Sequence, residues 1–156
     1  MRERGRRDLN VRRVLFDTDV LLDALDENRP ESQEACLALK NCNGGGDLGL
    51  VASGSLKDVY YVLCKRYGEN NARNAVGLLL DLLVVVPVGE EECLLALQSN
   101  EPDFEDGQVR AAAELNDISI ILTRDAGAFR YSMVRTMTCA QYMELVRAEP
   151  RSSGRA

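Results

Sequence analysis

Two kinds of hydrophobic pattern alternate along the chain. Leu48–Ala52 and Ile118–Leu122 are apolar without alternation, as in strands that are covered on both faces of a sheet. Between such runs, apolar residues recur at three- and four-residue spacing, which is typical of amphipathic helices. The segment 55–67 has this spacing, and Gly68 ends it. The pattern therefore predicts strands that alternate with helices.

The expected elements follow from these patterns. Strands are expected at Val14–Asp17, Leu48–Ala52, Leu83–Val88, Ile118–Leu122 and Val134–Thr138. Helices are expected at Asp19–Leu25, Glu31–Lys40, Ser55–Tyr67, Ala72–Leu82, Glu90–Leu97, Asp103–Leu115 and Ala140–Arg147, with a short turn or helix at Ala126–Tyr131. Because helix follows strand throughout, we expect an α/β fold, namely a three-layer α/β/α domain with a mainly parallel five-stranded sheet.

Length and composition indicate one domain. The chain has 156 residues, of which 46% are apolar and 28% charged. We expect the domain to span residues 14–148, between a basic, flexible N-terminal arm at 1–13 and a flexible tail at 149–156. The richest apolar stretch, Ala75–Val88, is interrupted by Asp81 and is shorter than the ~20 residues that a membrane span needs. No apolar secretory core follows the arginine-rich start, so a cytoplasmic location is expected.

Charge is distributed unevenly. The chain carries a net charge of −6, whereas residues 1–13 carry +4 and residues 151–156 carry +2, which leaves −12 on residues 14–150. A body this acidic repels nucleic acid but concentrates oxygen ligands for hard cations. The basic arm fits either a solubilising segment or one that contacts RNA.

Two features of composition restrict the chemistry. The chain has no histidine, which excludes histidine general bases, Ser–His–Asp triads and histidine zinc sites. Its five cysteines include no CxxC pair and predict reduced, mostly buried thiols. Any catalysis must therefore use carboxylates, hydroxyls, Lys, Arg or a bound metal.

Carboxylates gather where the predicted strands end. Ligands of a parallel α/β sheet bind beyond the carboxyl ends of its strands. Acidic residues stand at these ends or in the first turn of neighbouring helices: Asp17, Asp19, Asp58, Asp103, Asp106 and Asp125. Taken singly, several have a structural explanation, since Ser55 and Asp58 resemble a capping box, Asp103 and Asp106 another, and Asp125 a cap. Capping explains neither Asp17 at the end of an apolar strand nor the convergence of four carboxylates.

A divalent cation would relieve the repulsion among these groups. Mg²⁺ prefers hard oxygen ligands, commonly one or two carboxylates together with waters. Such a centre can activate water and stabilise the charge of a phosphodiester during in-line displacement, without histidine. The composition and this chemistry agree.

Four segments in order resemble the motifs of the PIN domain family. Val14–Leu22 resembles the opening strand that delivers an Asp to a D-T-N/D turn, and Ser55–Tyr61 resembles the second motif. Asp103–Ala113 is similar to the third motif, an Asp followed by an alanine-rich helix, and Leu122–Phe129 to the fourth, T-x-D-x-x-x-F. Each motif alone is weak, whereas four in register over most of residues 14–146 are specific.

The resemblance implies a function and a set of roles. PIN domains are metal-dependent ribonucleases, and many bacterial members are homodimeric VapC-type toxins that an antitoxin peptide neutralises. By position, Asp17, Asp106 and Asp125 would bind Mg²⁺ or Mn²⁺, and Asp58 would bind metal or orient the attacking water. Asp19 and Asp103 would lie just outside the ligand sphere; Thr123 would hydrogen-bond a ligand or water, or cap a turn. Arg110 and Arg124 would contact phosphate, or belong to a solvated helix face.

One departure from the family pattern keeps a second interpretation open. Asp58 stands where the family usually carries Glu, which shortens the reach of the carboxylate by one methylene. A PIN-like binding or scaffold module with weak catalysis is therefore the alternative to a single-strand-specific endoribonuclease. A more remote alternative is a haloacid-dehalogenase-type phosphatase, with Asp17 as nucleophile and Asp19 as acid/base. Against it, Leu21 stands where those enzymes carry Thr or Val.

Apolar surface also predicts self-association. The helix that carries Tyr60 and Tyr61, together with a stripe at Val76, Leu79, Leu80 and Leu83, offers more apolar surface than one domain needs. The same residues would serve equally well as core on periodicity alone. A homodimer is the expectation from the first interpretation.

Overall fold

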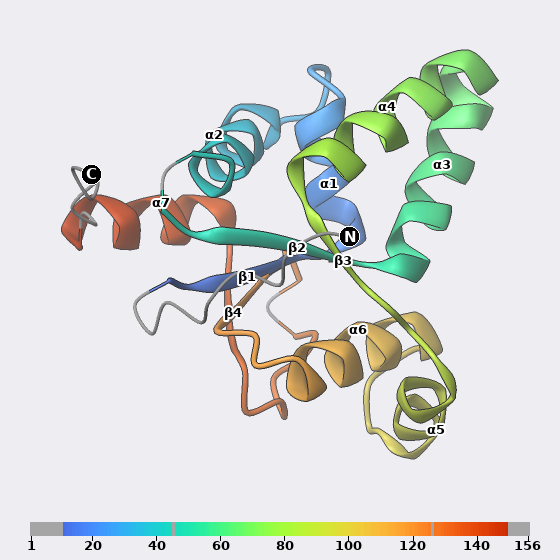
Figure 1. The fold of residues 1–156 in the computed structure, drawn as a ribbon, viewed down its shortest axis with the longest axis vertical. Coiled ribbons are helices and arrows are strands. Elements are labelled where there is room, and N and C mark those ends of the chain that lie inside the picture. The colour runs from blue at the N-terminus through green and yellow to red at the C-terminus, as the bar shows by residue number, and fades with distance from the viewer. Residues whose placement is uncertain (1–10, 45, 126, 150–156) are drawn as a thin grey trace, which may run out of the picture.

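The computed structural model describes residues 11–44, 46–125 and 127–149. Its centre is a five-stranded sheet in the order β3-β2-β1-β4-β5, parallel at every pairing (Figure 1). The strands are β1 (Arg13–Phe16), β2 (Leu48–Ala52), β3 (Val84–Val86), β4 (Ile120–Leu122) and β5 (Arg135–Met137). The predicted α/β class and the five parallel strands are confirmed, although β3, β4 and β5 are shorter than expected.

Helices cover both faces of the sheet. They are α1 (Thr18–Leu25), α2 (Ser32–Cys42), α3 (Ser53–Tyr67), α4 (Glu69–Leu82), α5 (Glu90–Gln98), α6 (Phe104–Leu115) and α7 (Cys139–Ala148). In Figure 1, α5 and α6 lie on one side of the sheet and the other helices on the opposite side. Successive residues of β1 alternate between the two layers: Val14 and Phe16 join the larger core, whereas Leu15 joins the core beside α6. The predicted three-layer arrangement is thus confirmed.

Strand register aligns the residues that follow the two central strands. Phe16 pairs with Leu122, the last residues of β1 and β4. The backbone N–H of Asp17 then donates to the carbonyl of Leu122 at 3.0 Å. Asp17 and Thr123 are therefore level at the carboxyl edge of the sheet, where parallel α/β folds place their ligands.

One local expectation was wrong, and a second is settled between its two alternatives. The capping box at Ser55 is absent because β2 runs directly into α3, whose N-cap is Ala52. Ser55 lies inside the helix with a buried side chain, and the hydroxyl of Ser53 accepts a hydrogen bond from the Val88 backbone instead. The segment after Asp125 is a turn rather than a helix over residues 127–131, and Ala126 lies outside the described residues.

The fold begins earlier than the expected boundary at residue 14, because Arg12 is buried and Arg13 belongs to the first strand. Residues 1–10 of the predicted arm and 150–156 of the predicted tail lie outside the described residues. Arg13 opens β1, and Arg12 forms an ion pair with Asp47 at 3.7 Å. Over the described ranges, no helix is long and apolar enough to cross a membrane.

Candidate active site

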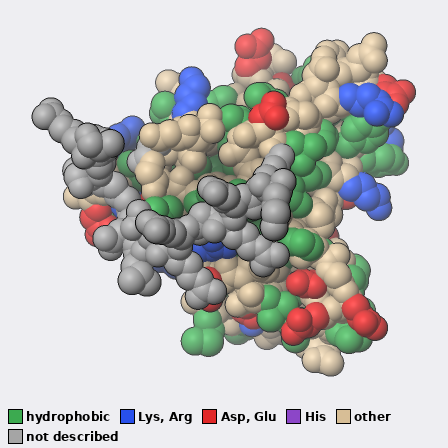
Figure 2. Space-filling view, viewed as in Figure 1, with side chains coloured by type: hydrophobic (Ala, Val, Ile, Leu, Met, Phe, Trp, Pro, Cys, Tyr) green, Lys and Arg blue, Asp and Glu red, His purple; other side chains and the backbone are tan. Residues whose placement is uncertain are grey.

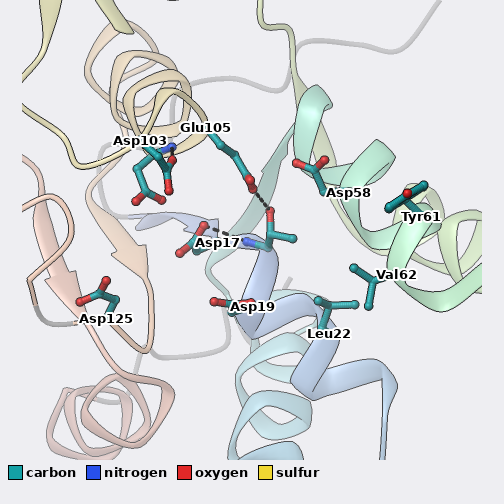
Figure 3. A pocket seen from close by; sticks show the side chains of 11 residues that line it. Asp17, Asp19, Leu22, Asp58, Tyr61, Val62, Asp103, Glu105 and Asp125 are labelled. Carbon is teal, nitrogen blue, oxygen red and sulfur yellow. Dashed lines mark hydrogen bonds between the residues drawn. The ribbon is translucent and has the colours of Figure 1, made fainter. Parts of the chain in front are cut away.

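A cleft of about 400 Å³ opens at the carboxyl edge of the sheet. Figure 3 shows side chains from the starts of α1 and α6, from α3 and from the loop after β4 pointing toward one another. Seven carboxylates line it, namely Asp17, Asp19, Asp58, Asp103, Glu105, Asp106 and Asp125, together with Thr18, Leu22, Tyr61 and Val62. The four predicted catalytic aspartates and the two predicted supporting ones thus share one cleft.

Asp17 is the buried member of this group, at 8% exposure. Its Oδ1 accepts the backbone N–H of Thr18 at 2.9 Å and so caps α1, while its Oδ2 accepts the hydroxyl of Thr123 at 3.0 Å. Burial raises the pKa of Asp17 to about 6, although both hydrogen bonds favour the ionised form. Thr123 therefore lies behind Asp17 and orients it, rather than lining the cleft.

The first turn of α6 brings three further acids to the cleft. Asp103 is the N-cap, and its Oδ1 accepts the backbone N–H of Asp106 at 2.8 Å, which confirms the predicted cap. Partial burial and then the charges of Asp103, Asp17 and Glu105 raise the pKa of Asp106 to about 7. The local charge is thus unfavourable for ionised carboxylates unless a cation is present.

Sequence reasoning missed Glu105 and Thr18. The Thr18 hydroxyl donates to Oε1 of Glu105 at 2.9 Å, which ties α6 to α1 (Figure 3). Burial and the neighbouring carboxylate of Asp58 raise the pKa of Glu105. The available signal was its place between Asp103 and Asp106, but acids in a first helical turn ordinarily serve the helix dipole.

Asp125 occupies the exposed rim. Its Oδ1 accepts the backbone N–H groups of Gly127 and Ala128 at 2.8 and 3.3 Å, so it organises its own turn. Its backbone N–H donates to the hydroxyl of Thr123 at 3.2 Å. One hydroxyl therefore connects the loop of Asp125 to Asp17.

The two predicted phosphate contacts, Arg110 and Arg124, do not line the cleft. Arg110 forms ion pairs with Glu101 at 3.2 Å and Glu114 at 3.0 Å. Arg124 has its Nε 2.8 Å from the buried carboxylate of Asp23. Its side chain is 39% exposed beside the loop of Asp125.

The donor set of the cleft fits a hard divalent cation. Within the described residues, no group of three or more acidic or cysteine side chains is arranged to hold a metal ion by itself. Mg²⁺ commonly bonds only one or two carboxylates and retains several waters. The side-chain donor atoms that line the cleft are all oxygens, and this set and the raised pKa values of Asp17 and Asp106 are compatible with that mode of binding.

Comparison with known proteins agrees with the fold. VapC20 of Mycobacterium tuberculosis, described as a sarcin–ricin loop cleaving toxin, superposes with a TM-score of 0.63 at 15% identity, over 73% of this chain and 91% of that one. A toxin–antitoxin complex from Klebsiella pneumoniae superposes with a TM-score of 0.61 at 19% identity, over 81% of this chain and 97% of that one. DNA-bound VapBC from Salmonella typhimurium superposes with a TM-score of 0.63 at 14% identity, over 83% of this chain and 99% of that one.

Sequence comparison supplies the family. No curated protein sequence gives a significant match. The family model of the PIN domain matches residues 13–127, a range that includes Asp17, Asp58, Asp106 and Asp125. This chain therefore belongs to the PIN domain family.

Proposed function

We propose that this protein is a Mg²⁺- or Mn²⁺-dependent endoribonuclease that cleaves single-stranded RNA, and that it acts as the toxin of a toxin–antitoxin pair. The observation that carries the proposal is the convergence of Asp17, Asp58, Asp106 and Asp125 on one cleft. These residues come from separate elements, and the pKa values of Asp17 and Asp106 are raised. Membership of the PIN family also disfavours the haloacid-dehalogenase alternative.

The side chains have distinct roles in this proposal. Asp17, Asp106 and Asp125 hold the cation, which when bound would activate water and stabilise the charge of the phosphodiester. Asp58 orients the attacking water, and Glu105, whose pKa is raised in part by Asp58, faces it across the cleft. Thr123 fixes the carboxylate plane of Asp17 through its 3.0 Å hydrogen bond.

The partners in this proposal are a second copy of the chain and an antitoxin protein. Of the predicted apolar stripe, Leu79 and Leu83 are buried in the core, whereas Leu80 is exposed together with Leu78 and Val84. Figure 2 shows hydrophobic side chains at the surface over α4 and β3. The solved relatives include toxin–antitoxin complexes, which supports the antitoxin, and sedimentation at micromolar concentration tests the homodimer.

The test of activity is cleavage of a mixed single-stranded RNA pool in Mn²⁺. We expect cleavage by the native protein, and its loss in EDTA, in Asp17→Asn and in Asp125→Asn. Asp81→Asn is the matched control, because Asp81 is an exposed acid on α4 outside the cleft. Undiminished cleavage by Asp17→Asn would remove the proposal.

The second candidate is a binding module with weak catalysis, which the shorter Asp58 favours. Thermal unfolding with and without Mn²⁺ separates the two, since a ligand that binds only the native state raises the melting temperature. A Mn²⁺-dependent increase without cleavage indicates an intact site and an unsuitable substrate. If the protein neither cleaves RNA nor gains melting temperature from Mn²⁺, the binding module is favoured.

A further inference from the structure

The cleft has two chemically unlike halves. Six of the seven carboxylates come from the starts of α1 and α6 and from the loop after β4, and the seventh, Asp58, comes from α3. The other side carries Leu22 from α1 with Tyr61 and Val62 from α3 (Figure 3). Leu22 is 3% exposed and forms the floor of this side, whereas Val62 is 36% and Tyr61 59% exposed. An apolar wall therefore adjoins the carboxylates inside the same cleft.

Tyr61 is placed by the same helix that places Asp58. The two residues are three positions apart on α3, a spacing that puts side chains on one helix face. Nζ of Lys65, one turn further along, lies 4.4 Å from the centroid of the Tyr61 ring. A carboxylate and an aromatic ring thus follow one another along the side of the cleft, and the cation of Lys65, which does not line the cleft, lies over the ring.

This arrangement answers a problem that the acidic cleft creates. Seven carboxylates repel a polyanion, so phosphate contacts to the protein cannot supply most of the affinity for RNA. Stacking of a base on an aromatic side chain adds affinity for single-stranded RNA and does not depend on base identity. An exposed tyrosine ring next to the carboxylates can supply that contact.

We propose that Tyr61, supported by Val62 and Leu22, forms a subsite for an unpaired nucleobase next to the scissile phosphate. The inference rests on the proposed ribonuclease function and extends it, because a base paired and stacked within a duplex cannot occupy the subsite. Nζ of Lys65 covers one face of the Tyr61 ring, so the base stacks on the opposite face. The subsite thus selects single-stranded substrate by shape and stacking rather than by hydrogen bonds to a particular base.

The experiment compares Tyr61→Ala and Tyr61→Phe with the native protein on short single-stranded RNA oligonucleotides. Each oligonucleotide is made intact and with one abasic nucleotide at successive positions around the cleavage site. Both kcat/KM in Mn²⁺ and Kd by fluorescence anisotropy in EDTA are measured. Tyr67→Ala is the matched control, since Tyr67 is an exposed tyrosine of α3 that does not line the cleft.

We expect Tyr61→Ala to lower kcat/KM on intact RNA about 5- to 100-fold, and Tyr61→Phe to leave it within about 3-fold. On the oligonucleotide that lacks the stacked base, the native protein should fall to the level of Tyr61→Ala, and the substitution should have no further effect. An equal loss on intact and abasic RNA would overturn the subsite, because Tyr61 would then act through folding or a subunit contact, which sedimentation detects.

Failure of the proposed function has a different signature. A native protein that binds the oligonucleotides without cleaving them, and whose melting temperature Mn²⁺ does not raise, contradicts the ribonuclease. The Kd comparison between intact and abasic RNA still decides the subsite. A native protein that neither cleaves nor binds them overturns both.

Discussion

The hydroxyl of Thr123 donates a hydrogen bond to Oδ2 of Asp17 at 3.0 Å, although the two residues are 106 positions apart in the chain. The same hydroxyl accepts the backbone N–H of Asp125 at 3.2 Å. A single buried oxygen therefore sets both the plane of the most buried carboxylate of the cleft and the path of the loop that carries another.

Replacement of Thr123 tests this connection. Thr123→Val keeps the shape but removes the donor to a buried carboxylate, which should cost about 1.5–3 kcal/mol of unfolding free energy and lower kcat at least 10-fold. Thr123→Ser keeps the hydroxyl and should retain most of the unfolding free energy and most of kcat. Urea unfolding and RNA cleavage measure the two quantities. Equal behaviour of the two variants would contradict the role of the hydroxyl.

Asp17 should make the metal-free protein less stable at neutral pH. Its pKa is about 6 in the folded protein and about 3.8 unfolded, so between these values the folded state holds more protons and stability falls as pH rises. Above pH 6 the cost is complete, at about 2–3 kcal/mol for this buried group.

Asp17→Asn removes that cost. In EDTA, the variant should exceed the native protein in unfolding free energy by about 2 kcal/mol at pH 7.5, and the difference should vanish near pH 4. Urea unfolding across this pH range is the measurement. Added Mn²⁺ should narrow the difference at pH 7.5, because the native carboxylate then has a counter-charge. A difference that does not vary with pH would contradict the assignment.

The order and kind of the elements could be predicted because each pattern is local. Runs such as Leu48–Ala52 and the three- and four-residue spacing of 55–67 are read within one segment. The start of α3 could not be predicted in this way, because Ser55 resembles an N-cap in the sequence. In the structure β2 runs directly into α3, and Ala52 is the N-cap. The sheet order likewise depends on which strands pair, which no single segment specifies.

The site divides in the same way. Asp17, Asp58, Asp106 and Asp125 are recognisable by their places at strand and helix ends, and the cleft does bring them together. Glu105 escaped notice because its hydrogen-bond partner, Thr18, lies 87 positions away. An acidic residue in the first turn of a helix can simply stabilise the helix dipole. Only its contacts with distant segments, and not its residue type, distinguish it from an acid that lines a cleft.

Glu105→Gln tests that missed residue. The amide oxygen of Gln keeps an acceptor for Thr18, so the link between α1 and α6 is preserved while the charge facing Asp58 is lost. We expect kcat to fall about 10-fold or more, with the unfolding free energy at neutral pH unchanged or higher. Glu91→Gln, an exposed acid on α5, is the control. Full activity of Glu105→Gln would restrict Glu105 to a structural role.

Arg124→Ala tests the ion pair behind the cleft. Asp23 is 1% exposed, and among the described residues it would keep only Arg29, at 3.3 Å, as a charged partner. We expect Arg124→Ala to lower the free energy of unfolding by about 1–2 kcal/mol. The double variant with Asp23→Asn should lose less than the sum of the two single losses. If the exposed end of Arg124 also contacts a phosphate, the salt dependence of RNA binding should weaken by about one contact. An unchanged salt dependence would assign Arg124 to the loop alone.

The position of β1 between β2 and β4 has a consequence for synthesis on the ribosome. Asp17 is made early, yet its carboxylate has no Thr123 to orient it until a further 106 residues have been added. At about 5–20 residues per second, this delay is roughly 5–20 s, and the exit tunnel lengthens it. A nascent chain is therefore incapable of forming the cleft for most of its translation.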